Sequence, residues 1–144
     1  MEKTLLIAGF GGQGVMLIGK TLGYVAVDHG YYVSYFPAYG AEQRGGTANC
    51  TLITSDEPIA CCLRQTFDKM IIMNELSFTR FANQLKPGGV MLVNSSLVNS
   101  RPSPDVRCVE IDSTALAKQV GNPRVANMVV LGAYIQLSGG YDVE

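Results

Sequence analysis

The sequence predicts an α/β domain built on a doubly wound, mostly parallel β-sheet. Short apolar runs alternate with segments of helical periodicity, and a glycine-rich turn joins the first apolar run to the first helical segment. Apolar runs of this kind are typical of parallel strands buried on both faces. The chain has 144 residues, of which 47% are hydrophobic, so we expect a single domain over residues 1–144.

The first elements predict a Rossmann-like βαβ unit. Residues 4–8 form a short apolar run that indicates a buried strand. Residues 15–29 carry apolar side chains three and four positions apart, which indicates a helix that stops at Gly30. Residues 31–36 are rich in aromatic and β-branched side chains, so they predict the second strand.

The rest of the chain extends this sheet. Residues 47–54 predict a strand and residues 59–63 a short return strand, which together suggest a β-hairpin inserted in the sheet or at its edge. Further strands are expected at 70–73, 90–93 and 107–111, and helices at 75–85, 114–120 and 127–137. The sequence stops soon after a Gly-Gly pair, which suggests truncation at the C-terminus or a naturally short form.

Composition excludes several classes of partner. The formal net charge is −1 and the basic residues are scattered, which argues against nucleic acid and against an anionic membrane surface. No apolar stretch is long enough to span a bilayer, and no secretory signal follows Met1, so we expect a cytoplasmic protein. Cys50, Cys61, Cys62 and Cys108 lack the spacing of metal or ferredoxin motifs, so we expect buried thiols and no metal site.

The glycine-rich turn is the first candidate site. Gly9, Gly11 and Gly14 have the spacing G-x-G-x-x-G, directly after a predicted strand and before a predicted helix. Glycine lets a ligand approach the backbone closely, and the free N–H groups of a helix start attract anions. We therefore predict a phosphate or pyrophosphate near Gly11, Gly12, Gln13 and Gly14; the alternative is a structural turn without a ligand.

The usual dinucleotide site is not well supported. The second predicted strand, residues 31–36, has no acidic residue at its end to bind a ribose hydroxyl. Asp28 comes too early in the sequence, and no lysine stands at the position that a Walker motif requires. An independent NAD(P)-type nucleotide-binding oxidoreductase is therefore the weaker alternative.

The loop after the second strand is the second candidate site. It carries Tyr39, Glu42, Gln43 and Arg44 between glycines. Ligands of open α/β sheets bind outside the carboxyl ends of the strands, so we expect this loop beside the glycine turn. There Arg44 can hold a phosphate or carboxylate in a bidentate grip, with Glu42 orienting it. The alternative is a solvated surface turn with one local ion pair.

Together the two segments resemble a known family. Gly-Phe-Gly-Gly-Gln-Gly-Val at 9–15 and Tyr-Gly-Ala-Glu-Gln-Arg-Gly-Gly-Thr-Ala at 39–48 are similar to the gamma subunit, or gamma domain, of the 2-oxoacid:ferredoxin oxidoreductases. Lys-Pro-Gly-Gly at 86–89 and the segment 127–133 fit as well. Members of this family act on pyruvate, 2-oxoglutarate, branched 2-oxoacids or indolepyruvate.

The resemblance implies a function that the chain shares with partners. It implies oxidative decarboxylation of a 2-oxoacid to an acyl-coenzyme A, with electrons passing to ferredoxin. Thiamine diphosphate and iron–sulfur clusters would lie on the alpha, beta and delta ferredoxin-like subunits, and the isolated chain would be inactive, with no tightly bound cofactor. By match to the motif, Gly11, Gly12, Gln13 and Gly14 would form an anion-facing turn, which would contact coenzyme A, the diphosphate of thiamine diphosphate or only the neighbouring subunit. Tyr39, Glu42, Gln43 and Arg44 would form the partner loop.

Other polar residues have simpler explanations, and none is assigned a catalytic role. His29, the only histidine, is expected to interact with a helix C-terminus. Asn94 to Ser96 are expected to form a polar turn, and Asn127 to cap the last helix or contact a ligand. A purely structural interaction module, in which the glycine turn packs against a partner, remains the second alternative.

Overall fold

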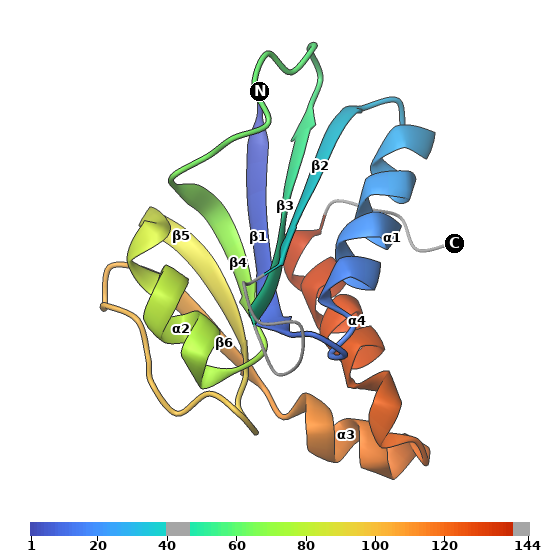
Figure 1. Cartoon of the computed structure of the whole chain (residues 1–144), viewed down its shortest axis with the longest axis vertical. Coiled ribbons are helices and arrows are strands. Elements are labelled where there is room, and N and C mark those ends of the chain that lie inside the picture. Colours follow the sequence, from blue (N-terminus) through green and yellow to red (C-terminus); the bar gives the residue numbers. More distant parts are fainter. Residues whose placement is uncertain (40–46, 140–144) are drawn as a thin grey trace.

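The computed structural model describes residues 1–39 and 47–139, which form one six-stranded sheet with helices on both faces (Figure 1). The strands are β1 (Lys3–Phe10), β2 (Tyr32–Tyr39), β3 (Thr47–Ser55), β4 (Phe67–Ile72), β5 (Leu85–Asn94) and β6 (Arg107–Ile111). The helices are α1 (Val15–Asp28), α2 (Glu75–Phe81), α3 (Ser113–Val120) and α4 (Ala126–Ser138), with 3₁₀ turns at Ala82–Gln84 and Pro123–Val125. The predicted α/β class, with a doubly wound and mostly parallel sheet, is confirmed.

The strand order is β2-β3-β1-β4-β5-β6. β1 pairs with β4, β4 with β5 and β5 with β6 in parallel, whereas β3 is antiparallel to both of its neighbours, β1 and β2. Within the described sheet, β3 alone therefore runs against the common direction. A hairpin is indeed inserted, but it consists of β2 and β3, and β3 separates β2 from β1.

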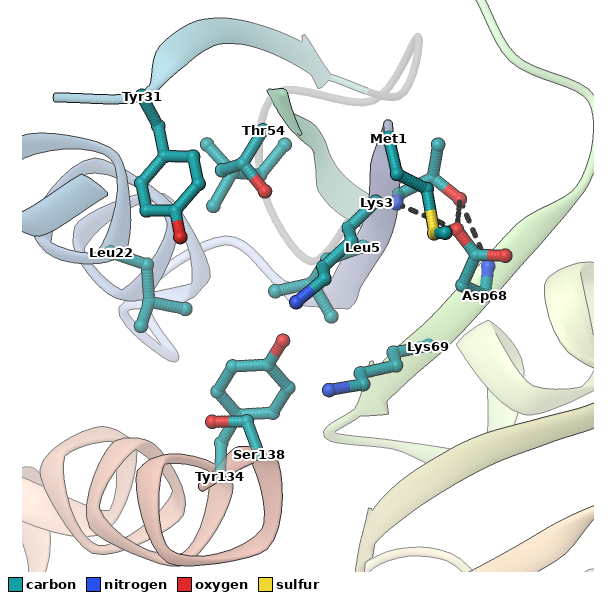
Figure 2. Close-up of a pocket in the computed structure, with 12 residues that line it drawn as sticks. Met1, Lys3, Leu5, Leu22, Tyr31, Thr54, Asp68, Lys69, Tyr134 and Ser138 are labelled. Atoms are coloured by element: carbon teal, nitrogen blue, oxygen red, sulfur yellow. Dashed lines mark hydrogen bonds between the residues drawn. The ribbon is translucent and has the colours of Figure 1, made fainter. Parts of the chain in front are cut away.

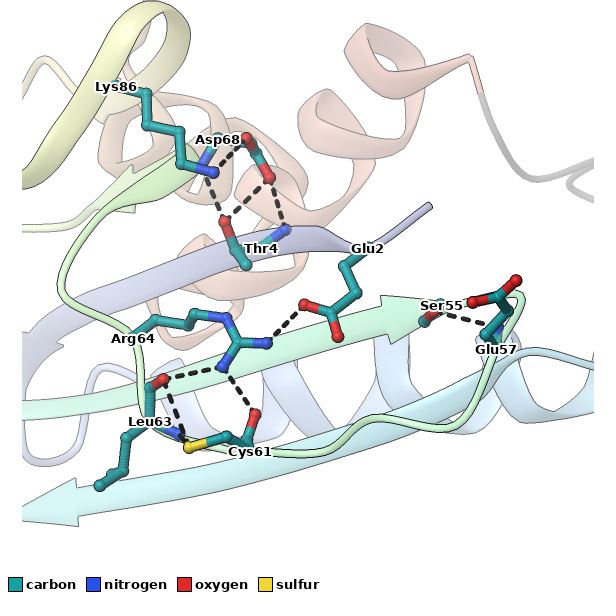
Figure 3. Close-up of polar contacts among 9 residues, drawn as sticks. All are labelled: Glu2, Thr4, Ser55, Glu57, Cys61, Leu63, Arg64, Asp68 and Lys86. Atoms are coloured by element: carbon teal, nitrogen blue, oxygen red, sulfur yellow. Dashed lines mark hydrogen bonds and ion pairs between the residues drawn. The ribbon is translucent and has the colours of Figure 1, made fainter.

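The predicted return strand at residues 59–63 was wrong. These residues form no strand but an irregular segment between β3 and β4. Arg64 forms hydrogen bonds with two backbone carbonyl groups of this segment. Its Nη1 donates to the oxygen of Cys61 at 2.7 Å and to that of Leu63 at 2.8 Å (Figure 3). The same guanidinium pairs with Glu2, so the segment is tied to the sheet by a side chain and not by a strand ladder.

Each face of the sheet carries its own core. On one face α1 and α4 pack against the strands, with Leu5, Ile7, Ile18 and Val130 among the buried residues. On the other face α2 and the segment before β6 cover a second cluster. This cluster contains Leu6, Ala8, Phe67, Met70, Ile72, Phe81, Leu85, Met91, Val93 and Val98. Successive side chains of β1 point to opposite faces of the sheet, and both faces are covered. The run from Thr4 to Gly9 is therefore buried throughout, as the apolar pattern predicts.

Two element boundaries differ from expectation. The helix after β4 changes to a 3₁₀ turn at Ala82, and β5 begins at Leu85, five residues earlier than the predicted strand start at Val90.

Along the segments that the structure describes, no helix combines the length and apolar character needed to cross a membrane.

Candidate functional site

The turn between β1 and α1 has the backbone conformation that its glycines allow. Gly12 and Gly14 have φ values of 90° and 75°, a region that other L-residues rarely adopt. A Cβ atom added to Gly11 or Gly12 would meet no atom within 4 Å, so the backbone there faces open space. Among the described side chains none caps the start of α1. The first N–H groups of the helix are therefore available to an anion.

Gln13 fixes this turn to the neighbouring strand. Its Oε1 accepts from the Phe10 N–H at 2.6 Å, and its Nε2 donates to the carbonyl oxygen of Met73, directly after β4, at 3.3 Å. A Cβ at Gly9 would lie 2.5 Å from Gln13 Oε1 and 2.9 Å from Met73 Cβ, so a side chain there would displace both Gln13 and Met73. The amide of Gln13 thus serves protein partners, so it acts on the turn by holding its shape.

Two asparagines complete the frame of the turn. Asn74 is 2% exposed and accepts from the Ser77 N–H at 2.8 Å, which caps α2, while its Nδ2 lies 3.4 Å from Gln13 Oε1. Asn127, in the first turn of α4, packs so closely on Gly14 that a Cβ there would lie 2.2 Å from its Nδ2. It is not the cap of α4, since the residue before that helix is Val125 and no side chain caps it. Asn127 therefore supports the turn from the side of α4.

The second candidate segment begins and ends at the same edge of the sheet. Tyr39 pairs with Ala48, which pairs with Gly9, and Thr47 pairs with Phe10. Two strand spacings separate Tyr39 from Gly9, which is roughly 10 Å. Tyr39 is 74% exposed and free to contact a ligand or a partner. Glu42, Gln43 and Arg44 lie outside the described residues, so their place in the site stays a prediction.

Arg80 is a cation at this edge that the sequence pattern did not single out. It lies on α2, and its Nη1 donates to Thr47 Oγ1 at 3.0 Å, next to the end of the second candidate segment. The signal available in the sequence was its position in the helix that directly follows β4, because such helices begin at the carboxyl edge of the sheet.

Two carboxyl groups among the described residues of this edge, those of Glu75 and Asp112, have pKa values below their ordinary range. The hydroxyl of Ser100 and the backbone of Asn99 and Ser100 lower the pKa of Glu75. The hydroxyl of Ser96, and then the backbone of Ala115, lower the pKa of Asp112. Neither group is therefore suited to act as a general acid near neutral pH. The described residues of this edge offer the uncapped N–H groups of α1 and the guanidinium of Arg80, which suit the binding of an anion.

The remaining sequence candidates have structural roles. The ring of His29 lies 2.8 Å from the Val25 carbonyl at the end of α1, as expected. Asn94 accepts from the Ser96 N–H at 3.3 Å in the predicted polar turn. Cys50 is buried, and burial raises the pKa of its thiol to about 12. The expectation that all cysteines are buried was wrong for Cys61 and Cys62, which are exposed because their segment forms no strand.

Comparison with known proteins identifies the family to which the chain belongs. The family model described as pyruvate ferredoxin/flavodoxin oxidoreductase matches residues 4–144. The chain is 35% identical over 144 residues to the ketoisovalerate oxidoreductase subunit VorA of Methanothermobacter marburgensis. That match covers 99% of this chain but only 30% of VorA, so the chain spans about a third of that relative's length.

Two solved structures share the fold. The keto/oxoacid ferredoxin oxidoreductase gamma subunit of Geobacter sulfurreducens PCA superposes with a TM-score of 0.82 and 31% identity, over 97% of this chain and 79% of that one. The 2-oxoglutarate:ferredoxin oxidoreductase of Magnetococcus marinus, solved with 2-oxoglutarate, coenzyme A and succinyl-CoA bound, gives a TM-score of 0.85 and 27% identity. This second match covers 94% of this chain and 24% of that one. On these matches, the chain belongs to the pyruvate ferredoxin/flavodoxin oxidoreductase family, in which it is homologous to the gamma subunits.

Proposed function

We propose that the chain is the gamma subunit of a thiamine diphosphate-dependent oxidoreductase that converts a 2-oxoacid to an acyl-coenzyme A and passes the electrons to ferredoxin. Its contribution would be an anion-binding surface for coenzyme A, built from the turn at Gly11, Gly12 and Gly14, which Gln13 holds in shape, and from the segment that carries Tyr39, Glu42, Gln43 and Arg44. Thiamine diphosphate and iron–sulfur clusters would be held by alpha, beta and delta-type partner subunits.

The observation that carries this proposal is the open backbone of the glycine turn. Gly11 and Gly12 are exposed, and the space where their side chains would stand is empty of protein atoms within 4 Å. Coenzyme A carries three phosphate groups, and a phosphate can approach backbone N–H groups closely only where no Cβ intervenes. The start of α1 and the guanidinium of Arg80 add positive potential at the same edge.

The described residues of this edge suggest which part of the reaction this chain would support and which part the partner subunits would carry out. Along the described segments, no group of three or more metal-ligating side chains comes together, and the two carboxylates discussed above are tied up in hydrogen bonds. Carbanion chemistry and electron transfer would thus belong to the partner chains. The role of this chain would be to bind and orient the acyl acceptor. Binding in a fixed orientation accelerates group transfer without a catalytic side chain.

An affinity-tagged chain tests this function when it is purified from its own cells together with its partners. The purified assembly should reduce a viologen dye only when both a 2-oxoacid and coenzyme A are supplied. Pyruvate, 2-oxoglutarate, 3-methyl-2-oxobutanoate and indolepyruvate should be compared, because the substrate pocket lies mainly on other chains. An assembly without thiamine diphosphate, or one that reduces the dye with NADH alone, would refute the proposal and favour a nucleotide-dependent oxidoreductase.

Arg44→Ala tests the site separately from the function. Loss of a charge-assisted hydrogen bond should raise the KM for coenzyme A by about tenfold or more and leave the KM for the 2-oxoacid unchanged. Arg124→Ala, at an exposed arginine in the turn before α4, is the matched control and should change neither value. An unchanged KM for coenzyme A in both variants would remove Arg44 from the site, and the purely structural role of the turn would then be favoured.

A further inference from the structure

A pocket of about 230 Å³ lies between α1, α4 and the sheet, at the edge opposite the glycine turn (Figure 2). Lys3 lies at its rim and begins β1, whereas the glycine turn follows Phe10 at the other end of that strand. Seven residue steps along a strand correspond to roughly 23 Å. A ligand in this pocket therefore does not touch the turn proposed for coenzyme A.

The pocket has an apolar floor and a polar rim. The floor is formed by Leu5, Leu22 and Leu52, which are 4%, 2% and 3% exposed. The rim carries side chains with N–H or O–H donors, from the strands, the turn before β2, and α4. They are Lys3, Lys69, Tyr31, Thr54, Tyr134 and Ser138, and the bonded pair Thr4 and Asp68 also lines the pocket. This combination of an apolar base and a few convergent polar groups is typical of small-molecule sites.

Two lysines on neighbouring strands direct their ammonium groups toward this space (Figure 2). Leu5 pairs with Lys69 in the parallel register of β1 and β4, so Lys3 and Lys69 lie on the same face of the sheet, two positions apart. The Nζ of Lys69 lies 5.6 Å from the centre of the Tyr134 ring. Burial, and then the charge of Lys3, lower the pKa of Lys69, while Asp68 acts in the opposite sense.

Asp68 also lines the pocket, but among the described residues no carboxylate forms an ion pair with Lys3 or Lys69. The four ion pairs found within residues 1–39 and 47–139 involve the N-terminus, Arg64, Lys86 and Arg101, but neither Lys3 nor Lys69. Asp68 is adjacent in sequence, yet its oxygens are bonded to Thr4 and Lys86. Two like charges side by side, one of them partly desolvated, cost free energy unless an anion joins them.

We propose that this pocket binds a small organic anion, whose carboxylate or phosphate group lies between Lys3 and Lys69 and whose apolar part packs on Leu5, Leu22 and Leu52. The volume is below that of a pocket for a drug-sized ligand, which limits the ligand to a compact molecule. The bound anion compensates the repulsion between the two ammonium groups, so its affinity depends on both lysines.

The test is a titration of the full 144-residue chain with benzoate, phenyl phosphate and the neutral benzyl alcohol, followed by methyl NMR. The leucine methyl signals of the floor should shift in a saturable way with one or both anions. Benzyl alcohol should bind at least about tenfold more weakly, because it makes no charge-assisted hydrogen bond. Benzoate and phenyl phosphate then show whether the site prefers a carboxylate or a phosphate.

Variants decide whether the lysines cause the binding. Lys69→Met keeps the length of the side chain and removes the charge, and it should weaken anion binding at least about tenfold. Lys3→Met, at an exposed position, tests the same claim if Lys69→Met does not fold. Lys118→Met in α3 makes the same change in net charge outside the pocket and should leave the affinity unchanged. Binding that survives Lys69→Met and Lys3→Met, falls equally in Lys118→Met, or shifts none of the leucine methyl signals of the floor would overturn the proposal.

Discussion

At the scale of single residues, Gln13 determines the shape of the glycine turn. The motif alone predicts glycines that face an anion, and it places Gln13 among them. In the structure the side chain of Gln13 points back to the protein, where it bridges Phe10 and Met73. An amide that joins two backbone segments is a hydrogen-bonding detail of the folded chain, which the spacing of glycines does not encode.

Gln13→Ala should destabilise the protein by about 1–2 kcal/mol, because the Phe10 N–H and the Met73 carbonyl each lose a partner. Under the proposed function, it should also weaken coenzyme A binding by the assembly with partner subunits, since the turn loses its fixed shape. Urea unfolding and the KM for coenzyme A measure the two effects. Gln119→Ala, at an exposed position of α3, should change neither. A stable Gln13→Ala protein with normal KM would show that the turn holds its shape without this side chain.

Asp68 is the second residue whose role is set by its contacts. Its Oδ2 accepts from the Thr4 N–H and hydroxyl, both at 2.9 Å, and its Oδ1 from Lys86 at 3.0 Å (Figure 3). Burial by itself would raise the pKa of this carboxyl group. The hydrogen bonds from Thr4 and Lys86 outweigh burial, so the pKa lies below the ordinary value of 3.8. The ionised carboxylate thereby joins β1 to β4 and to β5.

A lowered pKa in the folded state gives a defined dependence of stability on pH. The stabilisation by Asp68 should be complete above pH 3.8 and should disappear as the pH falls through the lower pKa of the folded state. Asp68→Asn should therefore lower the free energy of unfolding at pH 7 and make it less dependent on pH between about 5 and 2. Urea unfolding across this range measures both. Thr4→Val removes the bond from the Thr4 hydroxyl to Oδ2 and the bond that this hydroxyl accepts from the Asp68 N–H, but it keeps the bonds from the Thr4 N–H and Lys86. It should show a smaller acid dependence of the same sign, and an equal acid dependence in all three proteins would contradict this account.

At the scale of elements, the close packing of α1 on the hairpin depends on one glycine. A Cβ at Gly19 would lie 2.6 Å from Cys50 Sγ and 3.0 Å from the Tyr35 ring. Cys50 and Tyr35 belong to β3 and β2, so α1 approaches both strands at this point. Burial, the main cause, raises the pKa of Tyr35 to about 12, in keeping with this close contact.

Gly19→Val should therefore destabilise the protein by about 2 kcal/mol through overpacking. Gly132→Ala is the matched change in α4, where an added Cβ meets no atom within 4 Å. It should stabilise the protein by roughly 0.5–1 kcal/mol, because alanine is the better helix former. Thermal unfolding of both variants measures the contrast. A neutral Gly19→Val variant would mean that α1 can move away from the hairpin at little cost.

The elements also show how far the sequence predicts the fold. The apolar runs of β1 and β4 and the periodic pattern of α1 were sufficient to predict these three elements. In each of them the local choice of residues agrees with the burial found in the structure. The partner of β3 was not predictable in the same way. Residues 59–63 are as apolar as a short strand, but strand pairing depends on distant segments, and β2 occupies the place beside β3. The sequence also predicted that the two candidate segments lie at one edge of the sheet, and the described ends of both segments do meet there. That this edge is a binding site stays a prediction, and the bonds of Gln13 and the nearby Arg80 required coordinates.

At the scale of the whole molecule, burial divides the sheet into a rigid centre and a more open edge. β1 and β4 lie in the middle of the strand order, and the run Leu5–Ala8 is almost fully buried between the two helical layers. β2 is an edge strand with one paired neighbour, and Tyr32, Phe36 and Tyr39 are all exposed. Under the proposed function, this edge strand with its exposed aromatic side chains would contact the partner subunits.

Hydrogen exchange of the backbone amides should reveal this division. We expect the slowest exchange at Leu5–Ala8 and Met70–Ile72, which open only when the whole domain unfolds, and exchange at least about a hundredfold faster along β2. Assembly with partner subunits should then slow exchange in β2 far more than in β1, if the edge is where they bind. Uniform protection across the six strands of the free chain would show instead that β2 is held as firmly as the centre, and an unchanged β2 after assembly would place the partners on another surface.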